Sequence, residues 1–157
     1  MIVERNFNPT TYTHSDKADQ LKIDNTQMTD EQQENLLRLH ELMVHIQGRL
    51  SIKFARPVQI QINSGFRSEA LNKAVGGVAT SQHSKGEAVD TVAVGVPIED
   101  YFKLMKELVN NKVIEVDQCI QERDAWLHIS LKKEGNRNQF LRMKIINGKT
   151  QYIKEPL

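Results

Sequence analysis

The pattern of apolar and polar residues first predicts a long amphipathic helix that begins at Thr29. Gln32 follows Thr29 by three residues, which is the capping-box pattern that satisfies free N–H groups at a helix start. Apolar residues then recur at helical spacing and give the helix one inward face; they are Leu36, Leu39, Met43, Ile46 and Leu50. His40 and His45 fall outside this stripe in our interpretation, and we expect both at the surface.

Two further helices are predicted downstream. Residues 97–111, "PIEDYFKLMKELVNN", carry Pro97 in the first helical turn, where a missing N–H is tolerated. The inward positions of this second long helix are Ile98, Phe102, Met105, Leu108 and Val109. Residues 68–75, "SEALNKAV", predict a short helix with Ser68 as its cap, and the two glycines that follow are expected to end it.

Alternating apolar residues predict the strands. Val58, Ile60 and Ile62 alternate with polar residues, as in a half-buried strand. Asn147-Gly148 suits a tight turn with positive φ and predicts a final hairpin. The remaining predicted strands are residues 87–94, 113–121 and 126–132, and the last hairpin spans 142–154. The fold class is therefore α+β, with a mostly antiparallel sheet packed against two main helices.

Residues 1–28 lack a comparable pattern. Tyr12, Leu21 and Ile23 are scattered apolar anchors in a polar stretch, so we expect an irregular arm with one short helix at residues 15–22. The chain contains no repeat, low-complexity tract or linker. We therefore expect residues 1–157 to form a single domain.

Composition excludes several function classes. The chain has 157 residues, of which 39% are hydrophobic and 26% charged, and its net charge is +1. These values are typical of a soluble globular protein. A net charge this small produces no broad electrostatic field that would attract nucleic acid or a membrane. The first ten residues, "MIVERNFNPT", lack an apolar segment, so we expect no secretion signal. The single cysteine, Cys119, cannot form an internal disulfide and is expected in the core.

The stretch "SQHSKGEAVD" (81–90) carries the first candidate chemistry. His83 and Asp90 can both bind a metal if the chain folds back between them, and Gly86 permits that turn. Asp90 opens an apolar strand, where a lone carboxylate costs several kcal/mol unless it is paired, hydrogen-bonded or metal-bound. A catalytic zinc site takes three protein ligands and leaves one position for water.

A third ligand is available in "WLHIS" (126–130). Strand alternation places Leu127 and Ile129 on one face and Trp126, His128 and Ser130 on the other. A single strand histidine is more often structural than metal-binding. Together with the two donors of the first motif, however, His128 completes a three-ligand set.

These motifs resemble the zinc D-Ala-D-Ala carboxypeptidase family, which includes murein peptidases, vancomycin-resistance D,D-dipeptidases and phage endolysins, with the Hedgehog signalling domain as a fold relative. The matching stretches are "SGFRS" (64–68), "LNKAVGG" (71–77), "SQHSKGEAVD" (81–90) and "WLHIS" (126–130). The similarity extends over about residues 7–132. It implies a Hedgehog/DD-peptidase-like fold and one zinc ion per chain.

The resemblance also implies residue roles. The family's zinc ligands correspond to His83, Asp90 and His128. Arg67, in the "SGFRS" motif, is expected both to bind substrate and to stabilise charge during catalysis, because a guanidinium is a rigid two-pronged donor. Ser81 is expected to hydrogen-bond substrate.

The general base is expected to be a carboxylate shortly before the last histidine, and two acids compete for this role. Glu122 matches the family's usual position in "QCIQE", whereas Asp124 lies nearer to the histidine; some relatives carry the acid three residues before it, where this chain has Ala125. A three-residue hairpin loop would pair Glu122 with Trp126 on the His128 face. A four-residue loop would instead place Cys119 opposite His128.

Two function classes follow. The first is a zinc metallopeptidase that hydrolyses peptide bonds in peptidoglycan stem peptides, with Trp126 as either a wall of the site or a core residue. The second is a non-catalytic zinc-containing module that binds cell wall or protein. Arg67 and a candidate base favour the enzyme.

Overall fold

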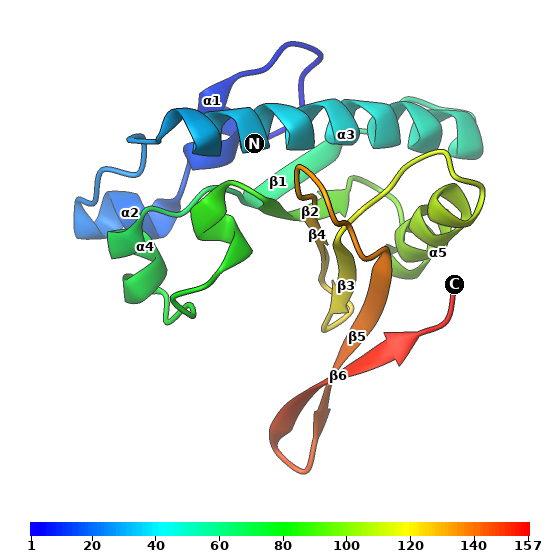
Figure 1. Cartoon of the computed structure of the whole chain (residues 1–157). Coiled ribbons are helices and arrows are strands. Elements are labelled where there is room, and N and C mark those ends of the chain that lie inside the picture. The colour runs from blue at the N-terminus through cyan, green and yellow to red at the C-terminus, as the bar shows by residue number, and fades with distance from the viewer.

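A six-stranded sheet with the strand order β1-β2-β4-β3-β5-β6 organises the structure (Figure 1). The computed structural model describes residues 1–157. The strands are β1 (Ile60–Ser64), β2 (Ala88–Ala93), β3 (Gln118–Glu122), β4 (Trp126–Ser130), β5 (Gln139–Ile146) and β6 (Lys149–Glu155). Neighbouring strands run antiparallel except β3 and β5, which are parallel. The predicted α+β class with a mostly antiparallel sheet is confirmed.

Five α-helices and one 3₁₀ helix accompany the sheet: α1 (Pro9–Thr13), α2 (Asp16–Leu21), α3 (Asp30–Phe54), α4 (Glu69–Ala74), η1 (Gln82–Lys85) and α5 (Ile98–Asn110). The predicted capping box of α3 is present, since Thr29 and Gln32 each accept a hydrogen bond from the other's backbone N–H. Pro97 precedes the first turn of α5 as its N-cap residue. None of the helices has the length and apolar character that crossing a membrane requires.

The long helices α3 and α5 share one hydrophobic core with one face of the sheet. That face is built from alternate strand residues that are at most 5% exposed: Ile60, Ile62, Val89, Ala93, Cys119, Leu127, Ile129 and Phe140. Because successive strand residues point to opposite faces, Asp90 and His128 project from the other side. The two helices thus leave the face that carries the chemistry uncovered.

The N-terminal arm is more ordered than the sequence predicts. The expected short helix is present as α2, but α1 was not anticipated, and Ile2 forms a β-bridge with Gln61 of β1. Tyr12 is fully buried. Its hydroxyl lies 2.7 Å from Nδ1 of His40, so the arm contacts α3 as well as β1.

The prediction that His40 is a surface residue is wrong. His40 is only 5% exposed, and its Nε2 donates to the carbonyl of Arg5 at 3.1 Å. It follows Leu36 by four residues and precedes Met43 by three, so helical geometry puts it on the buried face. A satisfied polar ring within an apolar stripe is invisible to a count of apolar residues. His45 is exposed, as predicted.

The hairpin registers decide a question that the sequence left open. Glu122 pairs with Trp126 and Ile120 with His128, so the β3–β4 loop has three residues and Cys119 faces Ile129 in the core. The predicted C-terminal hairpin is also present, with positive φ at Asn147 (51°) and Gly148 (74°). Figure 1 shows this β5–β6 hairpin projecting away from α3, beyond the rest of the sheet.

Candidate metal centre

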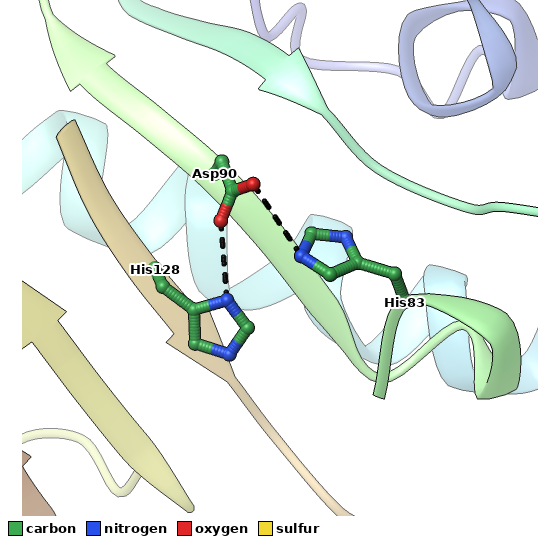
Figure 2. A group of neighbouring side chains, drawn as sticks. All are labelled: His83, Asp90 and His128. Atoms are coloured by element: carbon green, nitrogen blue, oxygen red, sulfur yellow. Dashed lines mark hydrogen bonds and ion pairs between the residues drawn. The ribbon is translucent and has the colours of Figure 1, made fainter. Parts of the chain in front are cut away.

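Three elements bring His83, Asp90 and His128 together on the open face of the sheet (Figure 2). Asp90 in β2 lies directly opposite His128 in β4, so cross-strand pairing alone places these two side chains in contact. His83 approaches from η1. One donor atom from each of the three residues lies within 4.8 Å of the other two.

The residues that begin and end η1 direct the side chain of His83 toward Asp90 and His128. Ser81 caps η1, and its hydroxyl accepts a hydrogen bond from the backbone N–H of His83 at 3.3 Å. Gly86 ends η1 with a φ of +73°, and the chain then enters β2. A Cβ at Gly86 would lie 2.6 Å from the carbonyl oxygen of Gln32, so only glycine fits this reversal.

The hydrogen bond of His83 fixes which of its ring nitrogens is free. Nδ1 lies 2.8 Å from the carbonyl oxygen of Gly65, and because a carbonyl only accepts, Nδ1 carries the proton. The lone pair of Nε2 therefore faces Oδ2 of Asp90, 3.4 Å away. Two electron-rich atoms at this distance call for a cation between them.

Asp90 remains ionised at the centre of the cluster. Burial alone would raise the pKa of its carboxyl, but the two neighbouring imidazoles of His128 and His83 outweigh that effect and hold the pKa well below its usual range. Oδ1 lies 3.1 Å from Nδ1 of His128, and the Arg67 guanidinium is 3.8 Å from Oδ2. Arg67 thus borders the candidate ligands, and its role in substrate binding stays a prediction.

Glu122 lies on the same face of the sheet as His128. It sits two residues beyond Ile120, the pairing partner of His128, so strand alternation returns it to that face. Partial burial, followed by the negative charge of Asp90, raises the pKa of its carboxyl. Trp126, the pairing partner of Glu122, is partly exposed, and its indole Nε1 is buried without a hydrogen-bond partner.

Asp124 occupies a different environment. It is exposed in the β3–β4 loop with a φ of +53°. It lines a cavity with Gln121 and Arg142, whose side chains bind Glu99 in the first turn of α5. Because Gln121 and Glu122 are adjacent in a strand, this cavity belongs to the helix-covered side of the sheet.

Sequence reasoning missed three groups that support the ligands. The carbonyl of Gly65 orients His83, and the side chain of Gln82 reaches Nε2 of His128 at 3.3 Å. Asp117, whose side chain is fully buried, accepts from Gln82 at 2.8 Å. Asp117 immediately precedes an apolar strand, which is the same buried-carboxylate signal that singled out Asp90. No sequence pattern indicates which way a side chain of a 3₁₀ turn points.

The donor set fits a zinc ion. Two imidazole nitrogens and one carboxylate oxygen are one of the three-ligand combinations found in catalytic zinc sites, with a further position for water. The proton on Nδ1 of His83 leaves Nε2 unprotonated, as a ligand nitrogen must be. The arrangement brings these three donor atoms together on the face of the sheet opposite α3 and α5, beside an arginine and a second carboxyl group.

Comparison with known proteins gives the same family as the motifs. A family model described as Peptidase M15 matches residues 14–130, from the end of α1 to the end of β4. This range contains all three candidate ligands together with Arg67 and Glu122. A search of curated proteins found no match. The chain therefore belongs to the peptidase M15 family, which makes it a hydrolase of the metallopeptidase class.

Proposed function

We propose that this protein is a zinc-dependent peptidase that hydrolyses peptide bonds in peptidoglycan stem peptides, with residues 1–157 acting as one domain. The observation that carries the proposal is the convergence of His83, Asp90 and His128 on the face of the sheet that α3 and α5 leave uncovered. Membership of the peptidase M15 family supports a peptide substrate.

One zinc ion per chain would be held by Nε2 of His83, Nδ1 of His128 and the Asp90 carboxylate. When bound, zinc supplies a Lewis acid that polarises a carbonyl and lowers the pKa of a water molecule. Asp90 stays ionised because the two neighbouring histidines hold its pKa low. The remaining chemistry falls to the neighbouring side chains.

Glu122 accepts a proton from the attacking water and passes it to the leaving amine. Its raised pKa suits this exchange, since a base works best when its pKa approaches the working pH. Arg67 binds a carboxylate or peptide carbonyl of the substrate, and Ser81 donates a further hydrogen bond to it. Trp126 forms a wall next to Glu122.

Digestion of purified muropeptides, with products identified by mass, tests this proposal. We expect one equivalent of zinc per chain, cleavage of a stem-peptide bond, and loss of cleavage on chelation with recovery when zinc is restored. The product masses distinguish removal of a terminal residue from internal cleavage. Stoichiometric zinc without any cleavage would instead indicate a non-catalytic zinc-containing binding module.

A further inference from the structure

Gln82 connects the candidate ligand His128 to a buried acid. Its Oε1 lies 3.3 Å from Nε2 of His128, on the opposite side of the ring from Asp90. Its Nε2 donates to Oδ2 of Asp117 at 2.8 Å. The side chain of Gln82 therefore bridges His128 and Asp117, which lie 46 and 35 residues from it in the sequence.

The Asp117 end of this bridge is held by two cations. Arg137 donates to both carboxylate oxygens, at 2.9 Å from Nε and 2.6 Å from Nη2. Lys132 adds an ion pair at 3.3 Å. The Asp117 side chain is fully buried, and the two neighbouring cations keep it ionised.

An ionised carboxylate determines how the Gln82 amide is turned. Because Asp117 can only accept hydrogen bonds, it must meet the NH₂ group of Gln82, and the carbonyl oxygen is directed to His128. A carbonyl only accepts as well, so Nε2 of His128 carries the ring proton. The lone pair of Nδ1 is then directed at Asp90, 3.1 Å away.

We propose that Gln82, anchored by Asp117, is the positioning residue that fixes the tautomer and ring orientation of His128 for metal binding. The proposal rests on the proposed metal site and deepens it. Residues that hydrogen-bond the outer nitrogen of a ligating histidine typically change metal affinity by about 10- to 100-fold. His83 receives the same support from the backbone carbonyl of Gly65, so only the His128 side depends on a replaceable side chain.

Gln82→Leu and Gln82→Met test the proposal, because both remove the amide and the unbranched methionine guards against a steric effect of leucine. Gln121→Leu is the matched control. Gln121 is another buried glutamine, bonded to Glu99 at 2.9 Å and Arg142 at 2.6 Å, and it lies on the helix-covered side of the sheet.

Two measurements serve as readouts. The first is the ¹⁵N NMR signature of the His128 ring in metal-free protein, which distinguishes the two tautomers without any activity. The second is zinc affinity, measured by competition with a chelator. We expect the Nε2–H tautomer in the wild type and in Gln121→Leu. Both Gln82 variants should lose that preference and bind zinc about 10- to 100-fold more weakly.

Retention of the Nε2–H signature and of full zinc affinity in both Gln82 variants would overturn the positioning role. An equal loss of affinity in Gln121→Leu would also overturn it, because the effect would then belong to any buried glutamine. A wild-type protein that binds no zinc would instead contradict the proposed function, while the NMR signature of the metal-free protein would still report the action of Gln82.

Discussion

At the scale of single residues, two carboxyl groups on one face of the sheet have opposite electrostatic environments. Asp90 lies between two histidines, which hold its pKa low despite burial. Glu122 is not flanked in this way, and partial burial together with the charge of Asp90 raises its pKa. Paired acids whose pKa values are driven apart are a common basis for distinct roles in catalysis. Asp90 is suited to hold a cation and Glu122 to exchange a proton.

Replacement of Glu122 by glutamine tests this division of roles. Glu122→Gln keeps the size of the side chain but removes the group that accepts a proton, so we expect kcat for muropeptide cleavage to fall by about 10²- to 10⁴-fold. Zinc content should stay at the wild-type level, because Glu122 is not among the proposed ligands. Steady-state kinetics and metal analysis of the same preparation measure both quantities.

Asp124→Asn is the control for that experiment. Asp124 is exposed and lines a cavity on the helix-covered side of the sheet, so its variant should retain cleavage within about twofold of the wild type. If Asp124→Asn abolishes turnover while Glu122→Gln does not, the assignment of the base is wrong.

Asp117 predicts a pH-dependent contribution to stability. Burial raises the pKa of its carboxyl, but hydrogen bonds from Arg137 and Gln82 outweigh burial and hold the pKa at about 2, below the ordinary 3.8. A pKa lower in the folded state means that the carboxylate stabilises the fold above pH 3.8 and loses this effect as the pH falls towards 2. The difference corresponds to about 2 kcal/mol in the free energy of unfolding.

Asp117→Asn removes this titration. The wild type should exceed the variant in unfolding free energy by a margin that shrinks by about 2 kcal/mol between neutral pH and about pH 2. Urea unfolding at a series of pH values measures that margin. A margin that stays constant over the whole series would show that the ionised carboxylate is not the stabilising form.

At the scale of elements, the sequence predicted what depends on local periodicity and missed what depends on side-chain direction. The capping box at Thr29 and the turn at Asn147 act within a few residues, so both were correctly located. The β3–β4 register needed the structure, because two loop lengths were compatible with the same residues. His40 was misplaced because a buried histidine looks polar in any hydrophobicity pattern.

In the candidate site, too, the sequence indicated the residues in local motifs and missed a contact that depends on the tertiary fold. The three candidate ligands, which the structure brings together, were singled out because donor residue types stand in distinctive motifs at His83, Asp90 and His128. Gln82 lies inside one of these motifs but was not singled out. Its partner Asp117 is 35 residues away, and only the tertiary fold brings the two together.

Replacement of Gly86 tests how strongly the turn between the candidate ligands His83 and Asp90 depends on glycine. Gly86→Ala puts a Cβ 2.6 Å from the carbonyl of Gln32 in a left-handed backbone, so either α3 or the η1–β2 turn must move. We expect a loss of about 2 to 4 kcal/mol in unfolding free energy, together with weaker zinc binding. Chemical unfolding and chelator competition measure these two effects.

Gly76→Ala separates the backbone cost from the steric clash. Gly76 has nearly the same φ, +75°, but its Cβ would meet nothing within 4 Å. The left-handed backbone alone then lowers the free energy of unfolding, by about 1 to 2 kcal/mol, and zinc affinity should not change. Equal losses of stability in the two variants would show that the contact with Gln32 relaxes freely.

At the scale of the whole molecule, the N-terminal arm supports the metal site from a distance. The carbonyl of Tyr12 accepts from the N–H of Phe66 at 2.7 Å, and a Cβ at Gly65 would lie 2.4 Å from the same oxygen. Gly65 in turn orients His83, and Arg67 follows Phe66. The arm therefore holds in place the loop that carries both Gly65, which orients His83, and Arg67, the candidate substrate-binding residue.

Asn25 is the main polar link between that arm and the loop, and its replacement tests the connection. It is only 4% exposed, donates to the carbonyls of Thr13 (2.8 Å) and Phe66 (2.9 Å), and accepts from the N–H of Ser68 at 2.7 Å. Asn25→Ala leaves buried groups unpaired, so we expect a loss of about 2 to 4 kcal/mol in unfolding free energy. Zinc affinity, measured where the variant is still folded, should also fall, since the loop carrying Gly65 is released.

The exposed residue Gln27 provides the control for this effect. Gln27→Ala changes the same arm, where the side chain makes only long contacts of 3.4 and 3.5 Å with its neighbours, so stability and zinc affinity should both stay at wild-type levels. If Asn25→Ala lowers stability but leaves zinc affinity unchanged, then the arm holds the fold together without orienting His83. If stability and zinc affinity fall together, Asn25 helps to orient His83, although it precedes this candidate ligand by more than fifty residues. The loop of Gly65 and Phe66 connects the two, because Asn25 binds the carbonyl of Phe66 and His83 binds that of Gly65.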